Sequence, residues 1–239
     1  MVRRRGEGRV RQERPARARD GQARRRDDAA DGDPHGDQPV AGATITEQLP
    51  EDKRAAYAAA LAEDGIPQAA IDHFDPWFAA VGTVGRAAAE ARLRSQSGVE
   101  DQLSAAASAV NKPVIGLETA EQQLGYFDTL PVPLQVKYLV STIDELPKMA
   151  AELDSMVTSW SAGDPDSLAK TLNEGLRDSP EIAKVLLADR NARWAKWIEA
   201  RLAQPGTVFV AVGAGHLAGA DSVQAFLAND KVRAERVDY

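Results

Sequence analysis

The stretch Thr207-Val-Phe-Val-Ala-Val-Gly-Ala-Gly-His-Leu-Ala-Gly219 decides the predicted fold. Every residue from Val208 to Val212 is apolar, which is typical of a central parallel strand that is covered on both faces. This strand runs into a glycine-rich turn that carries His216, and ligands of open α/β sheets bind just beyond such strand ends. The stretch therefore predicts a binding site, in which Gly213 and Gly215 let the backbone turn sharply and approach a cofactor or metal.

Most of the remaining chain has helical patterning. Between Leu139 and Trp160, apolar residues alternate spacings of four and three, which indicates a long helix or a helical hairpin with a kink at Pro147. Two further strands are predicted, Lys112–Glu118 and Lys231–Val237. The other predicted helices are Pro50–Glu63, Gln68–Phe74, Pro76–Arg94, 98–111, a helix capped by Thr119, Asp166–Arg177, Pro180–Leu202 and Ala220–Asn229. The predicted fold class is helix-rich α/β, a small mostly parallel sheet with a large helical portion.

Residues 1–43 have a different composition from the rest. They contain 11 Arg and 8 Asp or Glu, but no Lys and no aromatic residue, so they cannot bury a core and are predicted to be disordered. Three interpretations stay open: a solvated tail, a basic arm for nucleic acid, or a stretch translated from another frame or start site. The interleaved acids favour the tail or the artefact over the arm. We therefore expect one folded domain over residues 44–239.

Charge and composition exclude several classes of protein. The chain has a net charge of −7 and residues 1–43 carry +3, so the remainder carries −10, which argues against a nucleic-acid partner. The absence of cysteine excludes disulfides, thiolate ligands and cysteine nucleophiles. No apolar run approaches the roughly 20 residues of a membrane helix, so no transmembrane segment is predicted. The first residues also lack the apolar region of a secretory signal.

Three residues are candidates for the chemistry, each with a plainer alternative. His216 is a metal ligand or acid/base, or a turn histidine that caps the next helix. Glu118 ends another predicted strand, so in a shared parallel sheet it would meet His216 at one rim; otherwise it is a helix-capping acid. Arg190 shares an apolar helical stripe with Trp194. Either its charge is paired with a carboxylate of the site or a substrate anion, or it packs on the indole ring of Trp194.

The turn after Val212 also has a loose likeness to a dinucleotide-binding turn. Its third glycine comes one position late, and Glu235 stands about 20 residues further on, where such folds place a ribose-binding acid. A nucleotide fold would need several more strands than the sequence predicts, so the strand-end metal or acid/base site is the favoured interpretation.

Three motifs, taken together, carry a family resemblance. They are Gly116-Leu-Glu-Thr-Ala-Glu-Gln-Gln123, Asp189-Arg-Asn-Ala-Arg-Trp194 and Val210-Ala-Val-Gly-Ala-Gly-His-Leu-Ala-Gly219. With these motifs in this order over residues 49–239, the sequence resembles the TraB/GumN family, which is similar to the Tiki metalloproteases and the erythromycin-esterase-like proteins. The resemblance implies an α/β fold and a metal-dependent hydrolytic site built from two Gly-x-x-His motifs, a glutamate and an arginine.

The resemblance assigns roles to the candidate residues. His216 would bind a divalent metal such as Mn, Co or Zn, Glu118 would bind the metal or act as base, and Arg190 would stabilise an oxyanion. The implied function is a peptidase-like hydrolase that acts on a peptide or another small polar substrate. The alternative is a non-catalytic binding or accessory protein in export or envelope polysaccharide metabolism. Members of the family are often extracytoplasmic.

One part of the family pattern is not met. The first Gly-x-x-His motif belongs before Leu49, where the arginine-rich segment stands. Gly32-Asp-Pro-His35 has the spacing, but no apolar strand precedes it. We therefore expect a chain without the N-terminal half of the site, and a metal that binds weakly or not at all, because a catalytic metal needs about three protein ligands.

Overall fold

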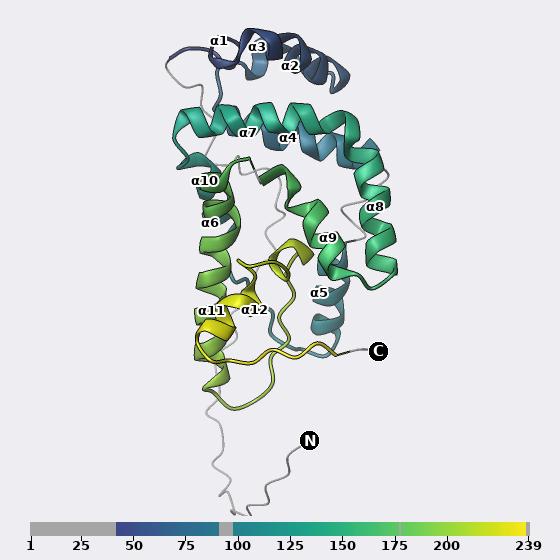
Figure 1. Cartoon of the computed structure of the whole chain (residues 1–239), viewed down its shortest axis with the longest axis vertical. Helices are drawn as coiled ribbons and strands as arrows, with labels where there is room; N and C mark the ends of the chain where they lie inside the picture. The colour runs from purple at the N-terminus through teal and green to yellow at the C-terminus, as the bar shows by residue number, and fades with distance from the viewer. Residues whose placement is uncertain (1–41, 91–97, 177, 238–239) are drawn as a thin grey trace, which may run out of the picture. The chain divides into compact units, whose positions relative to one another are not determined.

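The computed structural model describes residues 42–90, 98–176 and 178–237 (Figure 1). All of these belong to one compact unit that spans Asp33–Tyr239. The prediction that residues 1–43 are disordered falls almost entirely outside the described residues. The end of the helix predicted over Pro76–Arg94 also falls outside them.

Helices from the first half of the chain and from its middle enclose the first core. It is formed by α1 (Ile45–Gln48), α2 (Glu51–Glu63), α3 (Gln68–Ile71), α4 (Pro76–Glu90) and α7 (Val132–Glu145). Helix α7 packs on α4 and α2, and Figure 1 shows α7 and α4 side by side. Leu139 and Ile143 of α7 are buried at a spacing of four, which places both on the face that meets the core.

An aromatic stack links this core to helix α6 (Ala120–Asp128), which begins beside Glu118. Trp77 of α4 stacks on Phe127 of α6, with ring centroids 5.9 Å apart. Phe127 in turn lies 5.5 Å from the ring of Tyr138 in α7. Because aromatic pairs bury large areas in a defined geometry, the stack fixes α6 against the core.

The predicted kink at Pro147 is confirmed. Helix α7 ends in a 3-10 turn, η2 (Leu146–Lys148), and α8 (Met149–Ser161) follows it, because proline lacks the N–H that continues an α-helix. The remaining helical elements are α5 (Val99–Ala109), α9 (Pro165–Leu172), η3 (Glu174–Leu176), α10 (Pro180–Ala183), the π turn η4 (Lys184–Ala188), α11 (Asp189–Leu202), η5 (Ala214–His216) and α12 (Val223–Asn229). Among the described helices, none combines the length and the apolar character that crossing a membrane requires.

A smaller second core lies between α11 and α12. Its buried members are Trp194 and Ala195 of α11 with Val223 and Leu227 of α12. Side chains from the non-helical segments pack against it, namely Leu117, Val212 and Val232. The second core therefore joins the three segments that were predicted to be strands to helices α11 and α12.

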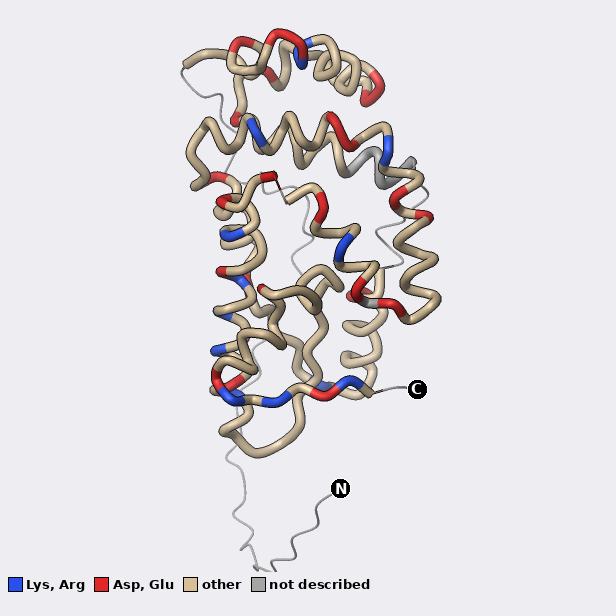
Figure 2. The backbone as a smooth tube through the Cα atoms, in the orientation of Figure 1, with Lys and Arg blue, Asp and Glu red and all other residues tan. Residues whose placement is uncertain are grey.

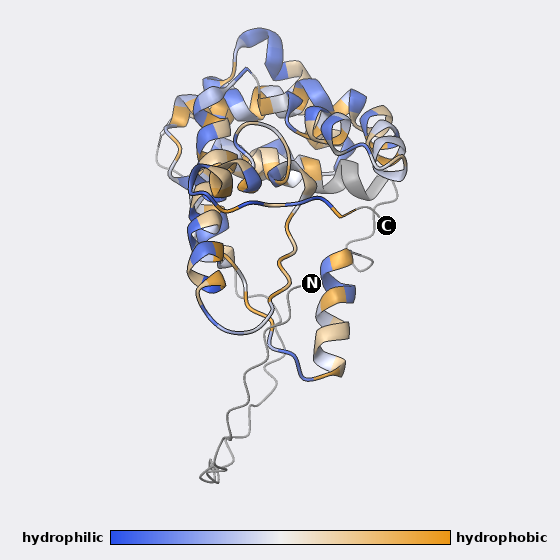
Figure 3. Ribbon diagram, turned by 60° about the horizontal axis from the view of Figure 1, so that its bottom comes forward, coloured by the Kyte–Doolittle hydropathy of each residue, from blue (hydrophilic) through white to orange (hydrophobic). Residues whose placement is uncertain are grey.

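The predicted sheet is wrong, because the part of the chain that the structure describes contains helices and no strand. Lys112–Glu118, Val208–Val212 and Lys231–Val237 run as irregular chain instead. The apolar parts of Lys112–Glu118 and Val208–Val212 are drawn in orange in Figure 3. Residues Lys231–Val237 carry the charges near the C-terminus in Figure 2. An apolar run indicates burial but supplies no neighbouring strand, and a sheet requires one. Here the partly buried Leu117, Val212 and Val232 pack on the second core without such a neighbour, whereas Phe209 is 77% exposed, so the stretch Val208–Val212 is not covered on both faces.

Candidate functional site

The backbone around Glu118 is held on both sides. Leu117 packs into the second core, and Thr119 caps α6 in a reciprocal capping box with Gln122. Gly116 allows the chain to fold back closely on Glu118, because a Cβ atom at position 116 would lie 2.7 Å from the carbonyl oxygen of Glu118. Glu118 therefore leaves the chain at a fixed point, between an apolar anchor and a helix N-terminus.

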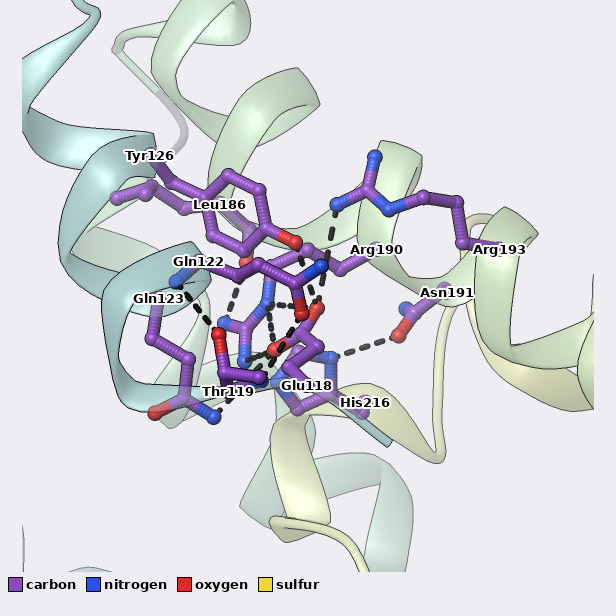
Figure 4. A network of polar contacts seen from close by, with 10 residues as sticks. All are labelled: Glu118, Thr119, Gln122, Gln123, Tyr126, Leu186, Arg190, Asn191, Arg193 and His216. Carbon is purple, nitrogen blue, oxygen red and sulfur yellow. Dashed lines mark hydrogen bonds and ion pairs between the residues drawn. The ribbon is translucent and has the colours of Figure 1, made fainter. Parts of the chain in front are cut away.

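Glu118 and Arg190 form a buried ion pair at the centre of the network in Figure 4. Their side chains are 3% and 18% exposed, and Nη2 of Arg190 lies 2.8 Å from Oε2 of Glu118. Nε of Arg190 donates to both carboxylate oxygens at 3.1 Å. Tyr126 donates its hydroxyl proton to Oε1, and Gln123 donates to Oε2. Burial raises the pKa of Glu118, but the hydrogen bonds and charge of Arg190 outweigh it, so the pKa lies below its usual value.

Arg190 satisfies both alternatives that its sequence pattern left open. It binds the carboxylate of Glu118, and its guanidinium also lies over the ring of Trp194, 5.0 Å from the centroid. Its Nη1 donates to the carbonyl of Leu186 at 3.1 Å. A guanidinium has five N–H groups, and the bonds to the described residues use the one on Nε and one on each of Nη1 and Nη2. One N–H on Nη1 and one on Nη2 thus remain for another acceptor.

Asn191 fixes the orientation of His216. Nδ2 of Asn191 donates to the carbonyl of Asp221 at 2.6 Å, which identifies the amide nitrogen and turns Oδ1 toward His216. Oδ1 lies 2.6 Å from Nδ1 of His216 and can only accept, so Nδ1 carries the proton. In the neutral imidazole, Nε2 then keeps its lone pair. This is the arrangement in which a histidine acts as a base or binds a metal.

The surroundings of His216 keep its ring neutral. Burial and the charge of Arg190 lower the pKa of His216 to about 4, although the charge of Glu118 acts in the opposite direction. The ring lies against Trp194, with centroids 4.5 Å apart. At neutral pH, His216 therefore offers an uncharged ring with an available Nε2.

The two glycines of the turn have different surroundings. Gly213 has a φ of −58°, which any residue adopts, and an added Cβ would make an ordinary contact of 3.8 Å with the His216 ring. Gly215 is tighter, since a Cβ there would lie 3.3 Å from Oδ1 of Asn173. Asn173 also donates to the carbonyl of Gly215. Gly215 thus lets the turn pack closely against the end of α9.

The structure brings Glu118, Arg190 and His216 into one cluster, although not through a shared sheet (Figure 4). The start of α6 and one face of α11 hold them instead. Asn191 lies in the sequence motif but was missed as a functional residue. The sequence does place a polar residue beside Arg190 in a helix with an apolar stripe. Asn191 is fully buried in the structure, and a buried amide must have hydrogen-bond partners.

As a metal site, the cluster is incomplete. Nε2 of His216 suits a divalent metal, but both oxygens of Glu118 already accept hydrogen bonds from the positively charged Arg190. Within residues 42–90, 98–176 and 178–237, no group of three or more His, Cys, Asp or Glu side chains could hold a metal ion. These residues alone do not fit a catalytic metal, which needs about three protein ligands.

Comparison with known proteins identifies the family. The sequence matches the TraB/PrgY/gumN family over residues 22–236. It is 34% identical over 131 residues to the uncharacterized protein YbaP of Escherichia coli K12, and equally to YbaP of Shigella flexneri. The match covers 53% of this chain and 46% of each relative, so the chain spans about half the length of the curated relatives it matches. No solved structure matches the chain. Because the family match covers most of the sequence and includes the whole cluster around Glu118, the chain belongs to the TraB/PrgY/gumN family.

Proposed function

We propose that this chain contributes part of the site of a metal-dependent, peptidase-like hydrolase. The observation that carries the proposal is the hydrogen bond from Nδ1 of His216 to Oδ1 of Asn191, which leaves Nε2 available. A histidine that binds a metal usually donates its other N–H to a fixed acceptor in this way. The neutral ring at physiological pH supports the same role, since a protonated imidazole cannot bind a cation.

The proposed roles differ among the three charged or titratable residues. His216 is the residue suited to hold a divalent cation such as Mn, Co or Zn. Arg190 is suited to stabilise negative charge on a substrate carbonyl oxygen through its remaining N–H groups. Glu118 is suited to hold Arg190 in place, because both of its oxygens accept from that guanidinium and its pKa is lowered, which weakens it as a base.

The proposed site requires further ligands that the described residues do not supply. Arg190 adds a positive charge near His216, which opposes a cation. We therefore propose that this chain by itself binds a divalent metal weakly and has little hydrolytic activity. The pairing of Glu118 with Arg190 also favours the second candidate, a non-catalytic binding or accessory protein, in which the pair serves structure alone.

Paramagnetic broadening by Mn²⁺ tests the role of His216. Because Mn²⁺ broadens the NMR signals of nearby protons, its addition should broaden the His216 ring signals before those of His73, an exposed histidine outside the cluster. The His216→Ala variant should lose this site-specific effect and bind Mn²⁺ more weakly in a calorimetric titration. Zn²⁺ should compete with the broadening.

Two results would contradict this proposal. Equal broadening of both histidines at every Mn²⁺ concentration would remove the ligand role of His216. Stoichiometric metal in the purified protein, lost in His216→Ala, would show by elemental analysis that the chain forms a complete site.

A further inference from the structure

Arg193 is a cation that lies beside the site without a hydrogen-bond acceptor of its own. It follows Arg190 by three positions on α11, and its Nη2 lies 3.9 Å from Oε1 of Glu118, too far for a hydrogen bond (Figure 4). A guanidinium has five N–H groups, and none of those on Arg193 donates to a described residue. The Arg193 side chain is 50% exposed, so a ligand from solution can reach these groups.

The carboxylate of Glu118 has no acceptor position left for Arg193. A carboxylate accepts about four hydrogen bonds. Four groups already donate to Glu118, namely the Tyr126 hydroxyl, the Gln123 amide, and Nε and Nη2 of Arg190. The charges lead to the same result, because the bonded pair with Arg190 already neutralises Glu118. One positive charge therefore remains here, in a chain whose net charge is −7.

Tyr126 holds the Arg193 guanidinium in place. The guanidinium lies over the Tyr126 ring, 4.9 Å from its centroid, and that of Arg190 lies 5.5 Å from the same centroid. The ring is itself fixed, because its hydroxyl donates to Glu118. Cation–π attraction thus orders the end of the Arg193 side chain before any ligand arrives, which lowers the entropy cost of binding one.

We infer that Arg193 binds an oxyanion of a ligand, a carboxylate or a phosphate group, at the edge of the Glu118–Arg190 pair. Both anions present two oxygens that match two parallel N–H groups of a guanidinium. Binding of the anion requires neither a metal nor catalysis. The inference rests on the proposed function in one respect: if the cluster belongs to a hydrolytic site, Arg193 selects substrates that carry an acidic group close to the reacting bond.

An NMR titration of the arginine side chains tests this binding. The Nε–H signals of the isotope-labelled full chain are followed in metal-free Tris–chloride buffer, while acetate or inorganic phosphate replaces chloride at constant ionic strength. We expect the Arg193 signal to shift saturably with at least one of these anions. The signal of Arg201, further along the same helix, should shift little, because Arg201 already donates to the carbonyl of Gln204.

Substitutions separate the guanidinium fork from charge alone, with affinity followed through the backbone amide signals of α11. Arg193→Gln should weaken binding of the preferred anion about ten- to a hundredfold, as for the loss of charge-assisted hydrogen bonds. Arg193→Lys keeps the charge without the planar fork and should bind with intermediate affinity. Arg201→Gln is the matched control and should bind as the original protein does. All three variants keep the buried Glu118–Arg190 pair.

The two anions distinguish the possible ligand classes. Tighter binding of acetate supports the inference and assigns a carboxylate, whereas tighter binding of phosphate supports it and assigns a phosphate group. The inference is overturned by equal shifts of the Arg193 and Arg201 signals, or by equal affinity of the original protein and Arg193→Gln, because the anions would then act only by screening. The titration contains no metal, so this failure would leave the proposed metal role of His216 to the Mn²⁺ experiment.

Discussion

Asn191 determines which nitrogen of His216 can react. The sequence indicated His216, Glu118 and Arg190, because their motifs combine a strand-like run, a helix start and an apolar stripe. It could not indicate the partner of His216, since that hydrogen bond joins residues 25 positions apart. Nor did it show that Arg190 and Glu118 pair across 72 positions; both contacts depend on how α6, α11 and the turn before α12 pack.

The pH dependence of stability should report the neutral state of His216. Its pKa is lowered from 6.5 to about 4 in the folded protein, so below pH 6.5 the unfolded chain takes up a proton that the folded protein does not. This contribution to stability is present above pH 6.5 and is lost as the pH falls toward 4. In urea unfolding, His216→Gln should therefore remove a pH-dependent loss of up to about 3 kcal/mol between pH 7 and 4.

The range from pH 7 to 8 serves as the control in this unfolding experiment. Between pH 7 and 8, the unfolding free energies of the original protein and His216→Gln should run parallel, because His216 is neutral in both states there. Curves that also stay parallel down to pH 4 would show that the ring is not held neutral by the fold.

The Glu118–Arg190 pair should be strongly coupled. Arg190→Met leaves the buried carboxylate with only the half-exposed Arg193, whose Nη2 lies 3.9 Å from Oε1 of Glu118, so the unfolding free energy should fall by about 3 kcal/mol. Adding Glu118→Gln to that variant should recover much of the loss, because no buried charge then remains. Lys196→Met on the same helix breaks an exposed pair with Asp230 and should change stability little. Additive effects of the two changes at the buried pair would contradict the coupling.

The helices were predictable because their signals are local. Thr119 was identified as a cap and Pro147 as a break, and each acts through the backbone within one turn. The segments predicted as strands failed for the opposite reason. Val208–Val212 has the composition of a buried strand, but a strand exists only with a paired neighbour, and composition says nothing about whether one is present.

Thr119, which caps α6, should contribute more to stability than a threonine in the interior of a helix. Thr119→Ala removes the acceptor for the N–H of Gln122 and should lower stability by about 1 kcal/mol, and it should also loosen Glu118 beside it. The matched control is Thr158→Ala in α8, where the hydroxyl donates only to the carbonyl of Asp154 in its own helix. Thermal unfolding of both variants tests this, and equal melting temperatures would count against the cap.

The two cores of the whole molecule should differ in local stability. The first core encloses Leu139 between several helices, whereas the second core lies beside residues 207–212, whose backbone groups make no backbone hydrogen bond to another described residue. In native-state hydrogen exchange, amides of α4 and α7 should therefore be the slowest, and amides of residues 208–212 should exchange early. Slow exchange at residues 208–212 would contradict this prediction.

The π turn Lys184–Ala188 has a consequence for the helical register of the site. A π turn amounts to an α-helix with one inserted residue, and each residue of an α-helix turns the chain by about 100°. The backbone carbonyl of Leu186, within this turn, accepts a hydrogen bond from the side-chain Nη1 of Arg190. Without the extra residue, α11 would present Arg190 and Asn191 about a quarter-turn away from Glu118 and His216. The meeting of the four side chains thus depends on a single added residue upstream of them.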